Sequence, residues 1–312
     1  MAATSALSSR ESATGTSTVV LTGVTGFLGR RVSAELAERG ARVIGLARPS
    51  SDTSRLDPRI VVRSGSLDSV DHLFRDEEVH AVIHCATAYG RKEQTLSEIL
   101  DANVVLPVRL LDLAVAHGTP CFLNADSFFN TRQELPAGLG YYALSKQHFR
   151  EYGMRVASQQ PLKFVNMQIE HMYGPHDSDD KFVPSLIHSL LANVDRMPMT
   201  AGEQRRDFVY VDDVAAAFAT VCQQRSVLAD GVTHMEVGTG VSTSVGEFAR
   251  LARELCGSRT ALDFGALAYR ANEIMDSRAD TAALARLGWS ARVDLRLGLT
   301  RTIAAARPPQ AP

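Results

Sequence analysis

The chain has 312 residues, 45% of them hydrophobic, which is enough for one large α/β domain with a smaller elaboration. Its 33 Lys and Arg residues stand against 35 Asp and Glu residues, and the net charge of -2 gives no general attraction to nucleic acid or to an anionic membrane surface. Charges or glycines interrupt every hydrophobic run before it reaches the roughly 18 residues that span a bilayer, so we expect a cytoplasmic protein that contacts neither membrane nor nucleic acid.

The ends of the chain and the cysteines carry little information about function. Residues 1–16 are small and polar and predict a disordered tail rather than a secretory signal, and the Pro-rich residues 306–312 predict a frayed end. The cysteines are widely spaced and lack the pattern of a metal site, so we expect reduced thiols and no bound metal. They are Cys85, Cys121, Cys222 and Cys256.

Short apolar strands alternate with amphipathic helical stretches along the first half of the chain. The expected strands are residues 18–22, 41–47, 60–62, 81–85, 121–124 and 163–168, and the expected helices are residues 29–39, about 95–117, and a helix that begins at Tyr142. Because each crossover between parallel strands covers a face of the sheet, this order predicts an α/β fold with a Rossmann-like, doubly wound parallel sheet.

The alternation loses its regularity after Tyr173, where loops rich in Asp, Pro and Gly separate shorter elements. We therefore predict a Rossmann-like domain over residues 17–172, to which residues of about 206–240 return. A smaller C-terminal lobe, mainly residues 173–305, is expected to bind the substrate.

A glycine-rich turn follows the first expected strand directly and opens the first helix. Glycines at such a junction let the backbone turn sharply and approach a pyrophosphate, whose charge is met by free N–H groups and by the positive end of the helix. This context predicts a dinucleotide site, and the alternative is close packing of helix on strand without a ligand. The residues expected to hold the cofactor here are Gly23, Thr25, Gly26, Phe27, Leu28 and Gly29.

The residue after the second strand predicts which dinucleotide binds. An acidic side chain there would accept hydrogen bonds from the ribose of NAD, but the position holds Arg48, whose guanidinium can pair with a 2′-phosphate. Arg30 and Arg31 lie in the first turn of the helix, where cations oppose the helix dipole unless an anion is near. The pattern favours NADP(H) and leaves NAD(H) open, and the alternative is three solvated surface arginines.

Tyr142 and Lys146 are four residues apart, so both project from one face of a helix. An ammonium near a phenol is expected to lower the tyrosine pKa from about 10 toward the working pH, where the phenol can exchange a proton with a carbinol oxygen. The pair predicts acid–base support for hydride transfer. Tyr141 would face elsewhere, as a packing or substrate-lining residue.

In this order and separation, the motifs resemble the extended short-chain dehydrogenase/reductase family, of the NAD-dependent epimerase/dehydratase type. The resemblance runs from Val19 to about Leu299, and further matching pieces are residues 65–67, 84–87, 103, 173–175, 206–213 and 287–289. For the cofactor, it implies that Ser66 and Leu67 lie near the adenine, that Ala86 lies along the dinucleotide and that Lys146 binds the nicotinamide ribose. For the reaction, it implies that Asn103 anchors a proton-relaying water. For the substrate, it implies that Arg206 contacts the diphosphate of a nucleotide sugar. Arg270 or Arg278 is a second candidate clamp and equally a solvated charge.

The end of the fifth strand departs from the family pattern. The family places a Ser or Thr there to bind the reacting oxygen of the substrate, and if residues 128–130 are the following aromatic corner, Ala125 fills that position. Ser127, Asp126 or a water then takes over, and we favour Ser127. Dehydratases of the family carry an Asp-Glu pair here, whereas this chain has Asp126 followed by Ser127, so elimination lacks its base.

The same segment and the residues around Tyr142 are most similar to nucleotide-sugar 4-ketoreductases of deoxysugar biosynthesis, such as the CDP-abequose synthase type. This likeness implies NADPH-dependent reduction of the C4 ketone of a nucleoside-diphosphate 4-keto-deoxyhexose by a homodimer, with Phe128, Phe129 and Tyr89 as an apolar lining. The alternatives are a nucleotide-sugar epimerase, another small-ketone reductase, or a non-catalytic NADP(H)-sensing regulatory protein, which Ala125 favours.

Overall fold

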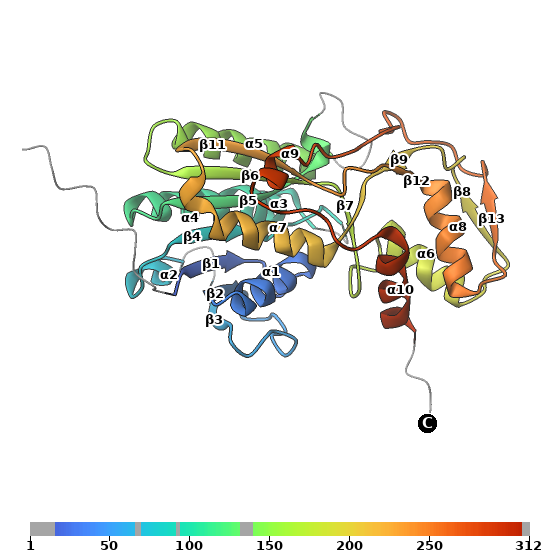
Figure 1. Ribbon diagram of the computed structural model, residues 1–312, viewed down its shortest axis with the longest axis horizontal. Coiled ribbons are helices and arrows are strands. Elements are labelled where there is room, and N and C mark those ends of the chain that lie inside the picture. Colours follow the sequence, from blue (N-terminus) through green and yellow to red (C-terminus); the bar gives the residue numbers. More distant parts are fainter. Residues whose placement is uncertain (1–15, 66–69, 92–93, 132–139, 308–312) are drawn as a thin grey trace, which may run out of the picture.

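A computed structural model describes residues 16–65, 70–91, 94–131 and 140–307 (Figure 1). Within these residues, seven parallel strands form one sheet in the order β11-β6-β5-β4-β1-β2-β3. Their bounds are β1 Thr18–Thr22, β2 Arg42–Ala47, β3 Val61–Ser64, β4 Ala81–His84, β5 Cys121–Ser127, β6 Lys163–Ile169 and β11 Gly231–Val237. The predicted Rossmann-like fold class is confirmed, and β11 returns to the sheet from late in the chain.

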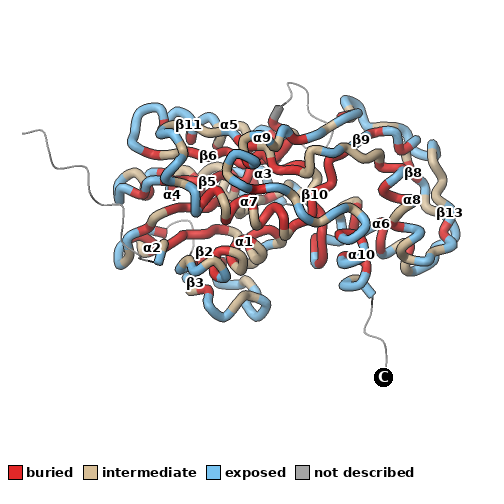
Figure 2. Tube along the Cα trace, in the orientation of Figure 1, coloured by how far each residue is buried: buried red, intermediate tan, exposed pale blue. Residues whose placement is uncertain are grey.

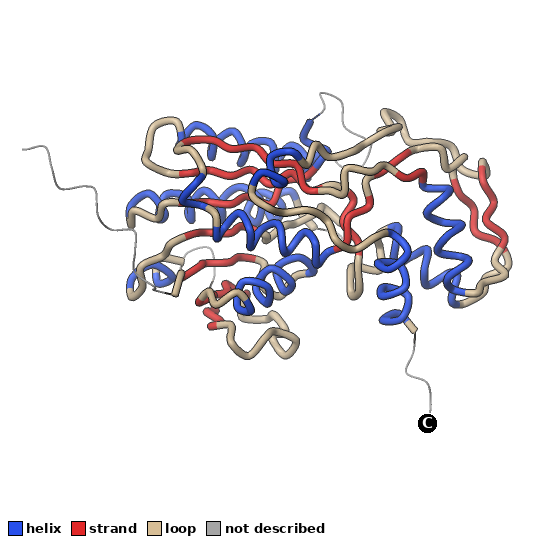
Figure 3. The backbone as a smooth tube through the Cα atoms, viewed as in Figure 1, coloured by secondary structure: helices blue, strands red, loops and turns tan. Residues whose placement is uncertain are grey.

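Helices cover both faces of this sheet, as Figure 3 shows. On one face, α1 (Phe27–Glu38) and α7 (Val211–Gln223) pack together over a core that includes fully buried residues of β1. On the other face lie α2 (His72–Arg75), α4 (Leu106–Ala116) and α5 (Gly140–Ala157). The ring of Phe149 on α5 lies 5.7 Å from that of Phe122 and 5.9 Å from that of Phe164. Such aromatic pairs contribute about 0.5–1.5 kcal/mol each beyond the area they bury.

The helix expected over residues 95–117 is interrupted. It is divided into α3 (Leu96–Leu100), a π-helical turn (Asp101–Val105) and α4. The wider turn directs Asn103 inward, where its side-chain oxygen accepts from the Ala88 N–H at 2.8 Å and its amide donates to the Ala88 carbonyl oxygen at 2.8 Å and to Ser145 Oγ at 2.9 Å. Buried backbone groups that follow β4 are thereby satisfied. β5 also runs three residues beyond its predicted end, because Ser127 still pairs with Ile169 of β6.

The smaller lobe is assembled from the later part of the chain and has its own core, which Figure 2 shows as buried segments at one end of the molecule. Its helices are α6 (Phe182–Leu191), α8 (Val245–Cys256) and α10 (Leu295–Ala306). Three two-stranded sheets join it: β7 (His171–Tyr173) with β10 (Phe208–Tyr210), β9 (Arg205–Arg206) with β12 (Thr243–Ser244), and β8 (Arg196–Met199) with β13 (Ala261–Phe264). The short helix α9 (Ala282–Arg286) lies against β11 of the main sheet.

Most of the two predicted tails lies outside the described residues. In the part of the chain that is described, no helix combines the length and apolar character needed to cross a membrane. Nor do the described His, Cys, Asp and Glu side chains form a group of three or more that could hold a metal ion. Cys121 and Cys222 are buried, and Cys85 and Cys256 are half-buried.

Candidate active site

The glycine turn is packed so closely that two of its glycines leave no room for a side chain. Gly23 adopts φ +69°, and a Cβ there would lie 2.6 Å from the Ala86 nitrogen, just past the end of β4. A Cβ on Gly29 would lie 2.0 Å from the Gly23 carbonyl oxygen. The close packing of helix on strand is therefore real, and it brings the backbone of Ala86 beside the turn. That Ala86 lies along the cofactor stays a prediction.

The start of α1 also has the features of an anion site. Its N-cap, Gly26, offers no side-chain acceptor, and the first turn holds no acidic residue. Arg30 Nε is buried without a hydrogen-bond partner among the described residues. Burial, and then the neighbouring charges of Arg55 and Arg31, lower the pKa of Arg30. An uncapped helix N-terminus beside an orphaned buried donor fits a phosphate group, so these residues suit a dinucleotide.

The other residues predicted for the cofactor are spread around this turn. Thr25 and Phe27 are half-buried within it, and Arg48 is exposed at the carboxyl end of β2. Arg31 pairs with Asp212 at 3.5 Å. Ser66 and Leu67 lie outside the described residues.

Tyr142 and Lys146 lie on α5 and are both buried, with exposed fractions of 7% and 1%. Lys146 Nζ donates a hydrogen bond to the Ala125 carbonyl oxygen at 2.9 Å. Burial lowers the pKa of Lys146 to about 8, and the negative charge of Asp126 opposes that fall.

The predicted direction of the Tyr142 pKa is wrong. Burial, followed by the proximity of Tyr89, raises the pKa of Tyr142 well above its usual value, while a hydrogen bond with the Ser127 side chain acts in the opposite sense. The cost of removing a phenolate from water dominates here. The ammonium that was expected to offset this cost is bonded to the Ala125 carbonyl oxygen instead.

The end of β5 supplies the remaining polar groups. Ser127 is the hydroxyl beside Tyr142, whereas the methyl group of Ala125 belongs to the core on the α1 side of the sheet. The carboxylate of Asp126 accepts hydrogen bonds from the side-chain amides of Asn130 and Asn166. The predicted aromatic corner includes Phe128 and Phe129, whose ring centroids are 4.1 Å apart.

A contact that the sequence did not predict links the Tyr142 region to the glycine turn. The ring of Tyr89 lies 5.0 Å from that of Tyr142. The ammonium of Lys181, just before α6, lies 5.1 Å from the Tyr89 centroid and 5.4 Å from that of Phe27. Lys181 is oriented by an ion pair with buried Asp177 at 2.7 Å. A lone lysine before an apolar helix gave no signal of this role.

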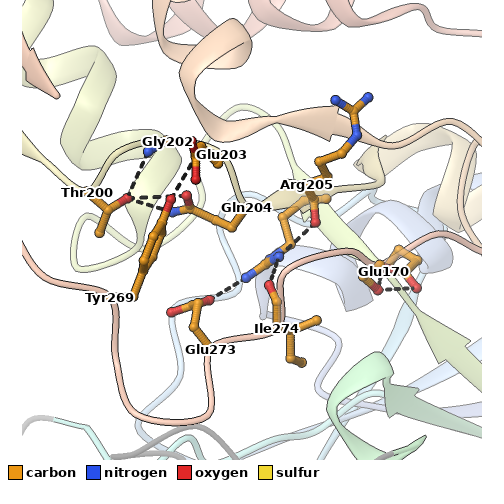
Figure 4. Close-up of polar contacts among 11 residues, drawn as sticks. Glu170, Thr200, Gly202, Glu203, Gln204, Arg205, Tyr269, Glu273 and Ile274 are labelled. Carbon is orange, nitrogen blue, oxygen red and sulfur yellow. Dashed lines mark hydrogen bonds and ion pairs between the residues drawn. The ribbon is translucent and has the colours of Figure 1, made fainter. Parts of the chain in front are cut away.

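Arg206, expected to clamp a diphosphate, contacts Arg205, Glu273 and Ile274 of the protein itself. It is 5% exposed, forms an ion pair with Glu273, and donates to the carbonyl oxygens of Arg205 at 2.7 Å and of Ile274. Figure 4 draws these contacts at Glu273 and Ile274, which precede the backbone pairing of Met275 with Arg205 of β9. Arg270 and Arg278 are exposed. A role of Arg206 or Arg278 at the substrate stays a prediction.

The model of the NAD dependent epimerase/dehydratase family matches residues 19–238. The chain is 35% identical over 289 residues to a CDP-abequose synthase of Salmonella typhimurium (strain LT2), covering 90% of this chain and 95% of that protein. It is similar to the solved structure of MoeE5 in complex with UDP-glucuronic acid and NAD, with 26% identity, a TM-score of 0.77 and coverage of 92% and 98%.

A further likeness concerns the fold alone. The structure of UDP-glucose-4-epimerase from Stenotrophomonas maltophila with bound NAD matches with a TM-score of 0.82 at 20% identity, over 93% of this chain and 98% of that one.

Proposed function

Because the chain belongs to the NAD-dependent epimerase/dehydratase family, we propose that it reduces the C4 ketone of a nucleoside-diphosphate 4-keto-deoxyhexose with NADPH. The likeness to CDP-abequose synthases supports this class of sugar, and the MoeE5 complex supports a site that takes a nicotinamide dinucleotide together with a nucleotide sugar. The observation that carries the proposal is the buried Tyr142 phenol, which is hydrogen-bonded to Ser127 and lies on the same helix as buried Lys146. A cytoplasmic homodimer is part of the same proposal.

The raised pKa of Tyr142 favours reduction over oxidation. A phenol that keeps its proton through neutral pH can act as the general acid that protonates the carbonyl oxygen. An oxidation needs a general base at the same place. The bound nicotinamide would supply the hydride to the carbonyl carbon. Tyr142 donates the proton that completes the alcohol, and the Ser127 hydroxyl holds the carbonyl oxygen. Water then returns a proton to Tyr142, while the Lys146 ammonium stays bonded to the Ala125 carbonyl oxygen one helical turn along α5.

The cations around the start of α1 support the phosphorylated cofactor. Burial, and then the charges of Arg55, Arg30 and Arg31, lower the pKa of His176, so four basic side chains face one region. Asp52 lies near Arg30 and Arg55, and Arg31 pairs with Asp212, so two carboxylates offset part of this positive charge and a phosphate would offset more of it. We expect NADPH to bind at least about tenfold more tightly than NADH, as one charge-assisted contact would give.

This preference is tested by titrating the purified protein with each nucleotide and monitoring binding by fluorescence. Arg48→Ala should reduce the ratio of NADPH affinity to NADH affinity. Arg59→Ala should leave this ratio unchanged, because Arg59 is exposed on the same loop and pairs with Asp57 at 2.6 Å. Equal affinity for NADPH and NADH would contradict the preference and return NAD(H) as the cofactor.

The reaction is tested by following NADPH oxidation with TDP-, CDP- and UDP-linked 4-keto-deoxyhexoses. Tyr142→Phe should lower kcat by about 100-fold or more and leave the NADPH affinity unchanged, because it removes the proton donor and keeps the ring. Tyr152→Phe, on the same helix and 53% exposed, is the matched control and should match the parent. Absence of turnover with all three nucleotides would overturn the proposal. A protein that binds NADPH without such turnover, and whose binding is unchanged in Tyr142→Phe, would point to a regulatory NADP(H) sensor.

A further inference from the structure

A row of polar side chains crosses the α5 face of the sheet just behind Tyr142 and Lys146. Asn124 of β5, Asn166 of β6 and His234 of β11 are in register. Asn124 Nδ2 donates to Asn166 Oδ1 at 2.8 Å, and the Asn166 amide contacts His234 Nδ1 at 3.2 Å, at the exposed edge of the sheet. Most buried polar groups make hydrogen bonds, and these contacts orient the Asn166 amide, although Asn124 Oδ1 has no partner among the described residues.

This row fixes one buried carboxylate. Asn166 Nδ2 donates to Asp126 Oδ2 at 2.7 Å, and Asn130 Nδ2 donates to the other oxygen, Oδ1. Asp126 is 4% exposed, and the two amides that bind it are equally well buried. Hydrogen bonds from two amides, one to each oxygen, hold the carboxylate in a single orientation. An amide cannot accept the carboxyl proton and move it onward, so the arrangement stabilises a fixed charge rather than a relay.

Lys146 is a buried cation on which the charge of Asp126 acts. Its Nζ is bonded to the carbonyl oxygen of Ala125, the residue before Asp126, at 2.9 Å. Removal from water disfavours the ammonium, and the charge of Asp126 is the largest influence that favours it. The other groups that face Lys146 are uncharged near neutral pH. Burial lowers the pKa of His84 on β4 far below its usual value and raises that of Cys85 to about 12.

We propose that Asp126 is a positioning residue that acts through Lys146: its buried, amide-bonded carboxylate is the counter-charge of the buried ammonium that is bonded to the carbonyl oxygen of the preceding residue. The effect on turnover rests on the proposed function, whereas the electrostatic coupling does not. In this role Asp126 neither touches substrate nor exchanges a proton with it. The chain has Asp126 without the neighbouring glutamate that elimination would need. The role toward Lys146 gives Asp126 a purpose that does not depend on elimination.

The sequence allows a direct test, because the chain contains four lysines, at positions 92, 146, 163 and 181. NMR of protein labelled with 13C at the lysine side chains follows each titration without any substrate, and Lys146→Arg identifies the signal. In the parent protein, Lys146 should titrate near pH 8. Asp126→Asn, which keeps the shape and removes the charge, should lower this midpoint by about one pH unit or more.

Three variants separate charge from packing. Asp126→Glu keeps the charge and should restore a midpoint near that of the parent. Asn130→Ala removes one hydrogen bond to the carboxylate but not its charge, so it should change the midpoint far less than Asp126→Asn. Asp126→Ser serves as a second neutral variant, and a cooperative thermal transition establishes that each protein is folded.

The proposal is overturned if the Lys146 midpoint is the same in the parent, Asp126→Asn and Asp126→Ser, or if Asn130→Ala lowers it as much as loss of the charge does. Kinetics then link the charge to the reaction. The alkaline limb of the kcat profile should move to lower pH in Asp126→Asn by the amount that NMR measures. A moved midpoint in a protein without ketoreductase activity would sink the proposed reaction and leave this coupling standing.

Discussion

At the scale of single residues, Gly29 shows most clearly how packing restricts the sequence. A methyl group at this position meets the Gly23 carbonyl oxygen at 2.0 Å, and that oxygen cannot retreat because it accepts the Gly26 N–H at 2.8 Å. One missing side chain therefore allows α1 to start directly on the end of β1.

Gly29→Ala should lower the free energy of unfolding by about 1–3 kcal/mol, the usual cost of an overpacked site. Urea denaturation measures the change, and Gly140→Ala is the control, because nothing lies within 4 Å of a Cβ built there. A Gly29→Ala protein as stable as the parent would show that the turn relaxes freely.

At the scale of elements, the segment of residues 269–281 ties the smaller lobe to the main sheet. Its backbone pairs with β9, where Arg205 N donates to the Met275 carbonyl oxygen at 2.8 Å. Beyond the end of β6, both carboxylate oxygens of Glu170 accept from Ser277 Oγ, at 2.9 and 2.7 Å. Glu170 is 6% exposed, and burial raises its pKa to about 7.

The raised pKa of Glu170 predicts how stability depends on pH. The folded protein holds this proton more tightly than the unfolded chain, whose carboxyl has a pKa near 4.5, so the contribution to stability is complete below about pH 4.5 and is lost as pH rises through about 7. Glu170→Gln imitates the protonated form and should remove a decline on the order of 2 kcal/mol between pH 5 and 8.

Denaturation curves at several pH values, with Glu254→Gln as an exposed control, measure this effect. Glu254 lies on α8 with 63% of its side chain exposed, so its variant should keep the slope of the parent. The same slope in Glu170→Gln would mean that Ser277 binds the ionised carboxylate without penalty.

At the scale of the whole molecule, the features predicted from sequence are those encoded over short distances. The strands, the glycine turn and the Tyr142–Lys146 spacing each depend on a few consecutive residues, and the fold class and the family drawn from them are confirmed. What escaped prediction depends on segments far apart in the chain. The contact of Lys181 with Phe27 and Tyr89, and the direction of the Tyr142 pKa, follow from burial that no local pattern encodes.

The position of β11 at the edge of the sheet also has a consequence for synthesis on the ribosome. Its partner β6 ends at Ile169, but β11 begins only at Gly231, after residues 170–230 have been translated. At ordinary elongation rates the nascent chain therefore holds an unpaired apolar edge for several seconds. Such an edge is a template for aggregation, and the timing makes this stretch of translation the period in which a chaperone would benefit the chain most.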